Sequence, residues 1–167
     1  MIFQDPYESL NPRWTIKDII KEPLDIHNIG NLTEREDTIV EILRTVGLTP
    51  PENYLSRYPH EISGGQRQRV SIARTLVMKP KFVICDEPTS MLDVSIRISI
   101  MDLMLNLAKE LEVSYLYITH DLAVARYMCD RIAVMFNGKI VEIAETEELL
   151  ENPIHPVSYT HLTLPTI

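Results

Sequence analysis

The sequence has no apolar run that approaches the roughly 18 residues a membrane-spanning helix needs. Its first five residues, 1–5, do not resemble a secretory signal. We find no internal repeat and no low-complexity tract in the rest of the sequence. We therefore expect that, if the protein works at a membrane, it docks onto another subunit.

Cysteine is scarce. Cys85 and Cys129 are the two cysteines, and they lie too far apart to resemble a pair of metal ligands. Cys85 stands inside a short apolar run. We predict that it is a buried thiol of a protein from a reducing cytosol.

Basic residues are outnumbered: 16 Lys and Arg stand against 24 Asp and Glu, for a net charge of −8. Surfaces that bind nucleic acid are normally basic, so this balance argues against a nucleic-acid partner. The length of 167 residues indicates about one domain, and 45% hydrophobic residues suffice for a core.

Proline-rich turns divide residues 5–62 into helices. Asn11 and Pro12 predict a turn, and residues 15–21 predict a short helix that stops before Pro23 because proline disfavours a helical residue in front of it. A stronger helix follows.

Thr33 is predicted to cap that second helix, with Glu36 completing a capping box. Gly47 is expected to end it. Its apolar face would consist of Ile39, Val40, Leu43 and Val46.

From Ser63 onward helices and strands alternate. Residues 63–78 and 94–111 are predicted helices, residues 82–85 form a short apolar run typical of a buried parallel strand, and residues 114–119 predict another strand. Together these elements indicate a parallel α/β sheet preceded by a helical insertion.

The last part of the chain predicts an antiparallel edge. Asp121 begins a further helix, and residues 132–136 and 139–143 flank Asn137-Gly138. Asn-Gly is a strong hairpin signal because a type I′ turn needs two positive φ angles.

Two adjacent carboxylates, Asp86 and Glu87, follow the apolar run at residues 82–85. The carboxyl end of a central strand is where open α/β sheets bind their ligands. One carboxylate would order Mg²⁺ and the other would position an attacking water. The alternative is an acidic pair in a loop at the end of a strand.

Residues 62–66 read Ile-Ser-Gly-Gly-Gln. Ser63 and Gln66 have the spacing of a capping box, so a helix start is expected in any case. A cap alone does not need Gly64 and Gly65, which cost helix stability. Without side chains they would let a phosphate approach bare N–H groups at the positive end of the helix dipole.

Three further residues are weak signals when taken singly. His120 ends a predicted strand and is as well explained by a structural role. Gln4 ends an apolar trio, and Asp93 could cap the helix that follows it.

Taken in order, these residues resemble the nucleotide-binding cassette of ABC transporters over about residues 1–156. The resemblance implies an α/β fold, the P-loop NTPase (RecA-like) core of an ABC ATPase, present in part and with an α-helical subdomain. The matching elements are the Q-loop glutamine Gln4, the signature sequence with Ser63, Gly64, Gly65 and Gln66, the Walker B strand ending at Asp86, the catalytic carboxylate Glu87, the D-loop ending at Asp93 and the switch histidine His120.

The resemblance implies ATP and Mg²⁺ as cofactors and a second ABC ATPase subunit, identical or not, as a partner. Asp86 and Gln4 would serve the metal, Glu87 would polarise the attacking water and His120 would contact the γ-phosphate. Residues 63–66 would contact ATP held by the partner subunit, and Asp93 would bridge the interface.

Family analogy further implies transmembrane permease subunits, an extracytoplasmic substrate-binding protein as an indirect partner, and a place at the cytoplasmic face of the membrane. Gln4 would relay closure to the permease through the helical block.

Two stretches resemble the peptide-importer branch of the family more narrowly. One is Phe-Gln-Asp-Pro at residues 3–6 followed by Ser-Leu-Asn-Pro-Arg at residues 9–13, and the other is Glu-Asn-Pro-Ile-His-Pro at residues 151–156. We therefore expect an ATPase that powers import of oligopeptides or dipeptides. The alternative is a non-transport ABC ATPase of the translation or DNA-repair type, whose usual tandem cassettes, coiled coils or zinc modules we do not find in the sequence.

The family's phosphate loop, G-x-x-x-x-G-K-[ST], does not occur among these residues. In the family it precedes the residue that corresponds to Gln4 and supplies an amide cradle, a lysine and a hydroxyl for Mg²⁺. We expect the 167 residues by themselves to show no ATPase activity.

The expected organisation has four parts: the end of a strand at residues 1–4, the helical subdomain at 5–75, the ATPase core at 76–145 and a C-terminal extension at 146–167. From about Val157 the sequence departs from the branch, because Val157-Ser158 intervenes before Tyr159-Thr160. We expect this tail to be foreign to the family or frame-shifted.

Overall fold

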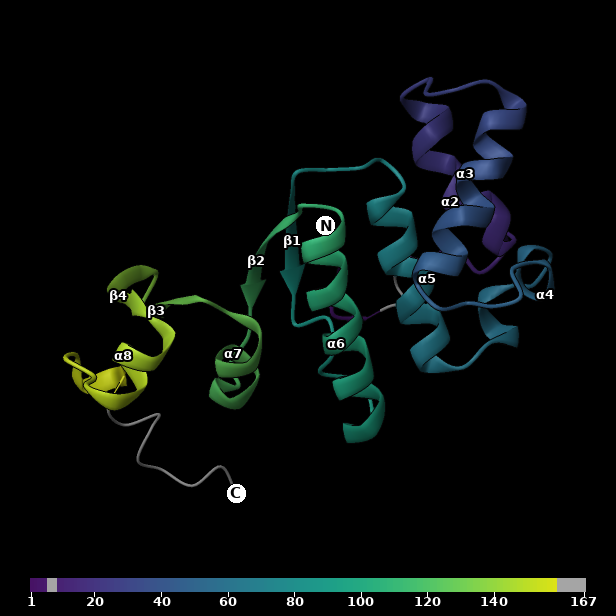
Figure 1. Ribbon diagram of the computed structural model, residues 1–167. Helices are drawn as coiled ribbons and strands as arrows, with labels where there is room; N and C mark the ends of the chain where they lie inside the picture. The colour runs from purple at the N-terminus through teal and green to yellow at the C-terminus, as the bar shows by residue number, and fades with distance from the viewer. Residues whose placement is uncertain (6–8, 159–167) are drawn as a thin grey trace. The chain divides into compact units, whose positions relative to one another are not determined.

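The computed structural model describes residues 1–5 and 9–158 (Figure 1). The chain forms two compact units, Met1–Leu116 and Tyr117–Ile167. The boundary predicted at residue 75 between a helical subdomain and an ATPase core stays a prediction. Pro6 and the tail from Tyr159 onward lie outside the described residues.

The first unit begins with helices that pack on one another. Helix α2 (Ile16–Ile26) starts at Thr15, whose hydroxyl accepts the N–H of Asp18 in a capping box. The prediction that this helix stops before Pro23 is wrong, because Pro23 lies inside it. An interior proline costs roughly 3 kcal/mol. Burial of four side chains at about 1.5–3 kcal/mol each outweighs that cost. They are Ile16, Ile19, Ile20 and Leu24.

Helix α3 (Leu32–Thr45) starts earlier than predicted. Its cap is Asn31 with Glu34 at the third position, so the predicted box of Thr33 and Glu36 is wrong. Both pairs have the right spacing, and asparagine is the stronger cap of the two residues. The predicted end is confirmed, since Gly47 follows with a φ of +75°. Of the predicted apolar face, Ile39, Leu43 and Val46 are buried and Val40 is half-buried.

Helix α5 (Gly64–Leu76) packs on α2 and α3 and is the central helix of the first unit. A short helix α4 (Glu52–Leu55) and a 3₁₀ turn η1 (Pro59–Glu61) lead into it. Ser63 caps α5 and Gln66 closes the capping box, as predicted.

The predicted order of strand, helix and strand is present over residues 82–118, the last two of which belong to the second unit. Strand β1 (Phe82–Asp86) is joined to β2 (Ser114–Ile118) by helix α6 (Val94–Glu110), and the two strands are neighbours in one sheet (Figure 1). Residue Ile2 forms a parallel bridge to Cys85. Cys85 is fully buried, as predicted, but the expectation that the whole run at residues 82–85 is buried is wrong, because Phe82 at the start of β1 is exposed.

The second unit contains helix α7 (Leu122–Met128), the hairpin of β3 (Arg131–Phe136) and β4 (Lys139–Glu145), and helix α8 (Thr146–Glu151). The predicted type I′ turn is confirmed, because Asn137 and Gly138 have φ angles of +48° and +76°. Bidentate hydrogen bonds from Arg126 to Glu147 join α7 to α8.

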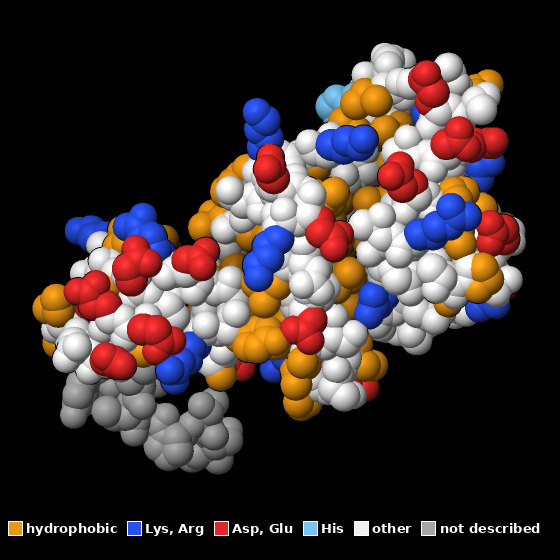
Figure 2. All heavy atoms as spheres, in the orientation of Figure 1, with side chains coloured by type: hydrophobic (Ala, Val, Ile, Leu, Met, Phe, Trp, Pro, Cys, Tyr) orange, Lys and Arg blue, Asp and Glu red, His pale blue; other side chains and the backbone are white. Residues whose placement is uncertain are grey.

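The hydropathy of the helices and the distribution of surface charge bear on the expected partners. Within the described ranges, no helix is long and apolar enough to cross a bilayer. On the face shown in Figure 2, lysine and arginine side chains alternate with acidic ones and form no continuous basic stripe among the described residues.

Candidate functional site

The N-terminal segment pairs with β1 and so places Gln4 beside the acidic pair. The Ile2 N–H donates to the Ile84 carbonyl at 2.8 Å, and the Asp86 N–H donates to the Ile2 carbonyl at 2.9 Å. Two residues further on, Gln4 Nε2 donates to Glu87 Oε2 at 3.4 Å. Gln4 therefore meets Glu87, 83 positions later in the sequence, where β1 ends at Asp86.

Glu87 occupies a strained turn. Its φ is +42°, in the left-handed region that a residue with a side chain adopts only at a cost of about 1–2 kcal/mol. Ser90 holds this turn, because its N–H and its hydroxyl both donate to the Glu87 carbonyl, at 3.1 and 3.0 Å. Such strain is concentrated at functional sites, where it aims a side chain that a relaxed backbone would not. Asp86 and Glu87 are both half-buried.

The oxygen donors at this site fit a magnesium ion held together with phosphates. Mg²⁺ in nucleotide sites takes one or two carboxylates and completes its shell with water and phosphate oxygens. Asp86, Glu87 and the amide oxygen of Gln4 supply such donors. Within residues 1–5 and 9–158, no cluster of three or more His, Cys, Asp and Glu residues could hold a metal without such further ligands.

The side chain of Gln66 is occupied by its own helix start and by α4. Its Oε1 accepts the Ser63 N–H at 3.0 Å, and its Nε2 donates to the Tyr54 hydroxyl at 3.4 Å. Ser63 in turn accepts the Gln66 N–H at 3.3 Å. The capping box predicted from the sequence is thus present, and it fixes the first turn of α5.

The two glycines at this helix start differ in their surroundings. A Cβ on Gly64 would have its nearest neighbours at 3.8 Å or more, at Leu92 and Arg67. A Cβ on Gly65 would lie 2.7 Å from Cγ2 of Ile96 on α6. Close packing of α5 on α6 therefore requires a glycine at Gly65, a reason that the sequence did not reveal. Contact of either N–H group with phosphate stays a prediction.

Asp93 takes the first position before α6 without capping it. It is exposed, and its side chain makes no capping hydrogen bond to the helix. The simple explanation of Asp93 as a helix cap is therefore wrong in this structure. Its predicted role at a subunit interface stays a prediction.

His120 is exposed two residues after the end of β2, in the second unit. Its neighbours form a local network: Thr119 Oγ1 accepts the Asp121 N–H at 3.1 Å, and Asp121 caps α7 by accepting the N–H groups of Ala123 and Val124. The contact of His120 with a γ-phosphate stays a prediction.

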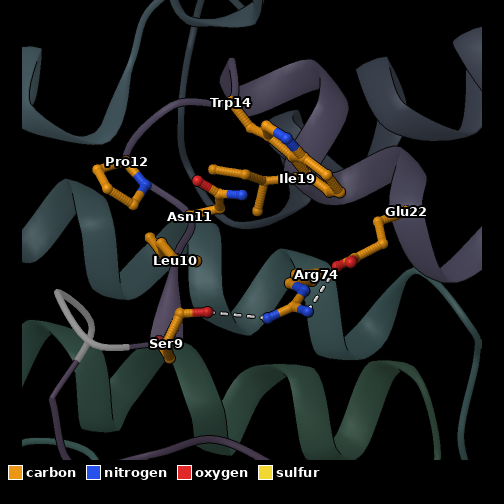
Figure 3. Close-up of a pocket in the computed structure, with 8 residues that line it drawn as sticks. All are labelled: Ser9, Leu10, Asn11, Pro12, Trp14, Ile19, Glu22 and Arg74. Carbon is orange, nitrogen blue, oxygen red and sulfur yellow. Dashed lines mark hydrogen bonds and ion pairs between the residues drawn. The ribbon is translucent and has the colours of Figure 1, made fainter.

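A pocket of about 290 Å³ lies where the Ser-Leu-Asn-Pro segment meets α2 and α5 (Figure 3). Arg74 at its floor donates to the Ser9 carbonyl at 3.0 Å and pairs with Glu22 at 2.6 Å. The segment that indicates the peptide-importer branch thus lines a hollow on the helical side of the first unit. Sequence reasoning did not single out Arg74, whose signal was a cation among the otherwise uncharged residues 70–76 of α5. The pocket is lined by Ser9, Leu10, Asn11, Pro12, Trp14, Ile19, Glu22 and Arg74.

Comparison with known proteins matches these features to one family. Residues 1–90 match the family model for ABC transporters. A solved structure of CbiO1 from Clostridium perfringens, part of the ABC transporter complex CbiONQ, superposes with a TM-score of 0.78 at 29% identity. The superposition covers 90% of this chain and 58% of that one.

Sequence relatives carry peptide-transport names. The chain is 54% identical over 98% of its length to the oligopeptide transport ATP-binding protein OppF of Bacillus subtilis. It is 54% identical to AmiF, an oligopeptide transport ATP-binding protein of Streptococcus pneumoniae, and 49% identical to the dipeptide transport ATP-binding protein DppF of Lactococcus lactis, in both cases over its whole length. The chain spans about half the length of these relatives, 53% of each.

Proposed function

The chain belongs to the ABC transporter family of ATP-binding proteins, and we propose that it acts in an ATP-hydrolysing subunit. This subunit powers import of oligopeptides or dipeptides. The observation that carries the proposal is the meeting of Gln4 with Glu87 at the carboxyl end of β1. The peptide class is supported by identities of 54% and 49% to peptide-transport relatives.

In the proposed mechanism each group of this chain has one task. Asp86 and the amide oxygen of Gln4 would hold Mg²⁺, and the ion would offset charge on the phosphates of ATP. Glu87 accepts a hydrogen bond from the attacking water, and the strained turn at Glu87 aims its carboxylate at that water. Gln4 would join the metal to residues 1–5, which precede the helical block in the sequence.

A second ABC ATPase subunit completes the site. The N-terminus of α5 at Ser63 and Gly64 contacts the γ-phosphate of ATP bound to that subunit, and exposed Asp93 faces it across the interface. Permease subunits hold the protein at the cytoplasmic face of the membrane, and a substrate-binding protein delivers the cargo to them.

Assembly tests the proposal. A chain that carries residues 1–167 together with a G-x-x-x-x-G-K-[ST] loop is expected to form dimers with Mg-ATP. The dimers should last longest when Glu87→Gln prevents hydrolysis, because the closed state then persists. Size-exclusion chromatography with and without Mg-ATP measures this. Glu110→Gln, at the exposed end of α6, is the matched control.

An unchanged monomer peak for Glu87→Gln in Mg-ATP would contradict the proposed ATPase. The peptide class has its own test: vesicles containing the permease should hydrolyse ATP faster when the binding protein carries a peptide than when it carries none. Equal rates would contradict peptide import.

A further inference from the structure

Arg69 connects three helices of the first unit. It lies on α5, one turn after Gly65, and its guanidinium donates two hydrogen bonds in different directions. Nη1 donates to the Val46 carbonyl at 2.6 Å, and Nη2 donates to the Ser99 hydroxyl of α6 at 2.9 Å. The planar guanidinium can serve both acceptors at once, which a lysine ammonium on a flexible stem does less well.

The position of the Val46 carbonyl at the end of α3 favours a cation. Val46 ends α3, where carbonyl groups lack partners within the helix and the helix dipole is negative. The next residue, Gly47, leaves the space that the guanidinium fills, since a Cβ there would lie 2.8 Å from Arg69 Nη1. Burial lowers the pKa of Arg69 from its ordinary value, and the group gives up hydration for these two bonds.

The contact at Ser99 repeats, one turn later, the close approach of α5 to α6. Gly65 meets Ile96 at the start of both helices, and Arg69 meets Ser99 next along both. Residues four apart on α5 and three apart on α6 lie on one face of each helix. Two successive contacts on the facing sides therefore define how far one helix slides along the other.

These two helices begin with proposed site segments. The start of α5 is the Ser63–Gln66 capping box, and α6 starts immediately after Asp93. A shift of α5 along α6 would change the separation of the two segments that the proposed function assigns to the partner subunit.

We propose that Arg69 is a positioning residue that sets the register of α5 against α6 through Ser99 and ties both to the end of α3 through Val46. The inference rests on the proposed function for its effect on turnover, but the helix register itself does not depend on that function.

Ser99→Ala tests the α6 contact with little risk to folding, because Ser99 is exposed. Ser95→Ala is the matched control, an exposed serine one turn earlier on the same helix. In the 167-residue chain, hydrogen exchange of amides in the first two turns of α5 and α6 is expected to accelerate about threefold or more in Ser99→Ala and to stay unchanged in Ser95→Ala.

In a chain with the phosphate loop, Ser99→Ala is expected to lower kcat about fivefold while KM for ATP changes by less than about twofold. Arg69→Lys should resemble Ser99→Ala, since a lysine keeps the charge near Val46 but loses the second bond. The double variant should lose no more than Arg69→Lys alone, because the two changes remove one shared contact.

The inference is overturned if Ser99→Ala matches Ser95→Ala in exchange, or if it lowers thermal stability while kcat and KM stay at their original values. If the unmodified chain with a phosphate loop does not hydrolyse ATP, the proposed function fails, and the exchange comparison alone then decides the register contact.

Discussion

The Gln4 amide donates a hydrogen bond to the Glu87 carboxylate at 3.4 Å, across 83 positions of sequence. The pairing depends on the bridge between Ile2 and Cys85, which aligns the N-terminal segment with β1. In the sequence, Gln4 lies between Ile2, which pairs with β1, and the helical block. Movement of that block is therefore expected to change the surroundings of Glu87.

Substitutions at Gln4 test this pairing in a chain with a phosphate loop. Gln4→Ala removes a hydrogen-bond donor to Glu87, and ATPase activity is expected to fall about tenfold, the lower end of the cost of removing a partner that orients a group at a metal site. Gln4→Glu should lower it further at neutral pH, because two carboxylates this close disfavour each other's charged form. Steady-state ATPase assays of the original chain and the two variants measure this order of activities. Equal or higher activity of Gln4→Glu relative to Gln4→Ala would mean that the two side chains are apart in the working enzyme.

The glycines of the signature sequence separate stability from function. Gly65→Ala is expected to lower the free energy of unfolding by about 1–3 kcal/mol, the usual cost of overpacking, because the new Cβ would lie 2.7 Å from Ile96. Gly64→Ala should leave it unchanged or raise it by up to about 1 kcal/mol, since alanine is the better helix former. Urea unfolding of both variants measures the difference.

Ile96→Ala provides the control for that pair, since it removes the methyl group that Gly65→Ala meets. The double variant should lose less stability than the sum of the two single variants. A simple sum would show that Ile96 is not the obstacle. In a chain with the phosphate loop, a stable Gly64→Ala variant that no longer forms dimers with Mg-ATP would support phosphate contact at that residue.

Gly47 and Gly138 both have positive φ but differ in their neighbours. At Gly47 a Cβ would lie 2.8 Å from Arg69, whereas at Gly138 it would meet nothing within 4 Å. Gly138→Ala is expected to cost about 1–2 kcal/mol of backbone strain. Gly47→Ala should cost about 1 kcal/mol more, because the guanidinium must leave the Val46 carbonyl. Denaturant titration of both variants checks this, and equal losses would argue against the role of Arg69.

Hydrogen bonds to Glu142 are expected to make the stability of the segment at residues 154–158 depend on pH. The Ser158 hydroxyl, and then the N–H groups of Ile154 and His155, donate to its carboxylate and hold its pKa below the ordinary value of 4.5. Because the pKa is lowered, the contact stabilises the folded segment at pH values above 4.5. This stabilisation is lost as the pH falls through the lowered pKa of Glu142.

Amide exchange at Ile154 and His155, corrected for intrinsic rates, is therefore expected to be slow near neutral pH and to accelerate when the pH falls below 4.5. Glu142→Gln should remove this acceleration, whereas Glu151→Gln, an exposed control on α8, should keep it. An acceleration of the same size in Glu142→Gln would assign the pH dependence to other groups.

The sequence alone determined several local structural features of this protein. The capping box of Ser63 and Gln66, the positive-φ turn at Asn137-Gly138 and the short strand that ends at Asp86 each depend on interactions among a few neighbouring residues. Such interactions are present in the pattern of residues, so their prediction succeeded. The family resemblance was likewise carried by short motifs in the right order.

Only the tertiary structure decided which local option prevailed and which distant residues meet. Helix α2 runs through Pro23 because its apolar face is buried, and Asn31 caps α3 in preference to a second pair with the same spacing. The fit of Gly65 against Ile96 and the bonds of Arg69 to Val46 and Ser99 join residues 23 to 31 positions apart. Packing between elements sets such contacts, and no local pattern of side chains specifies which surfaces will face each other.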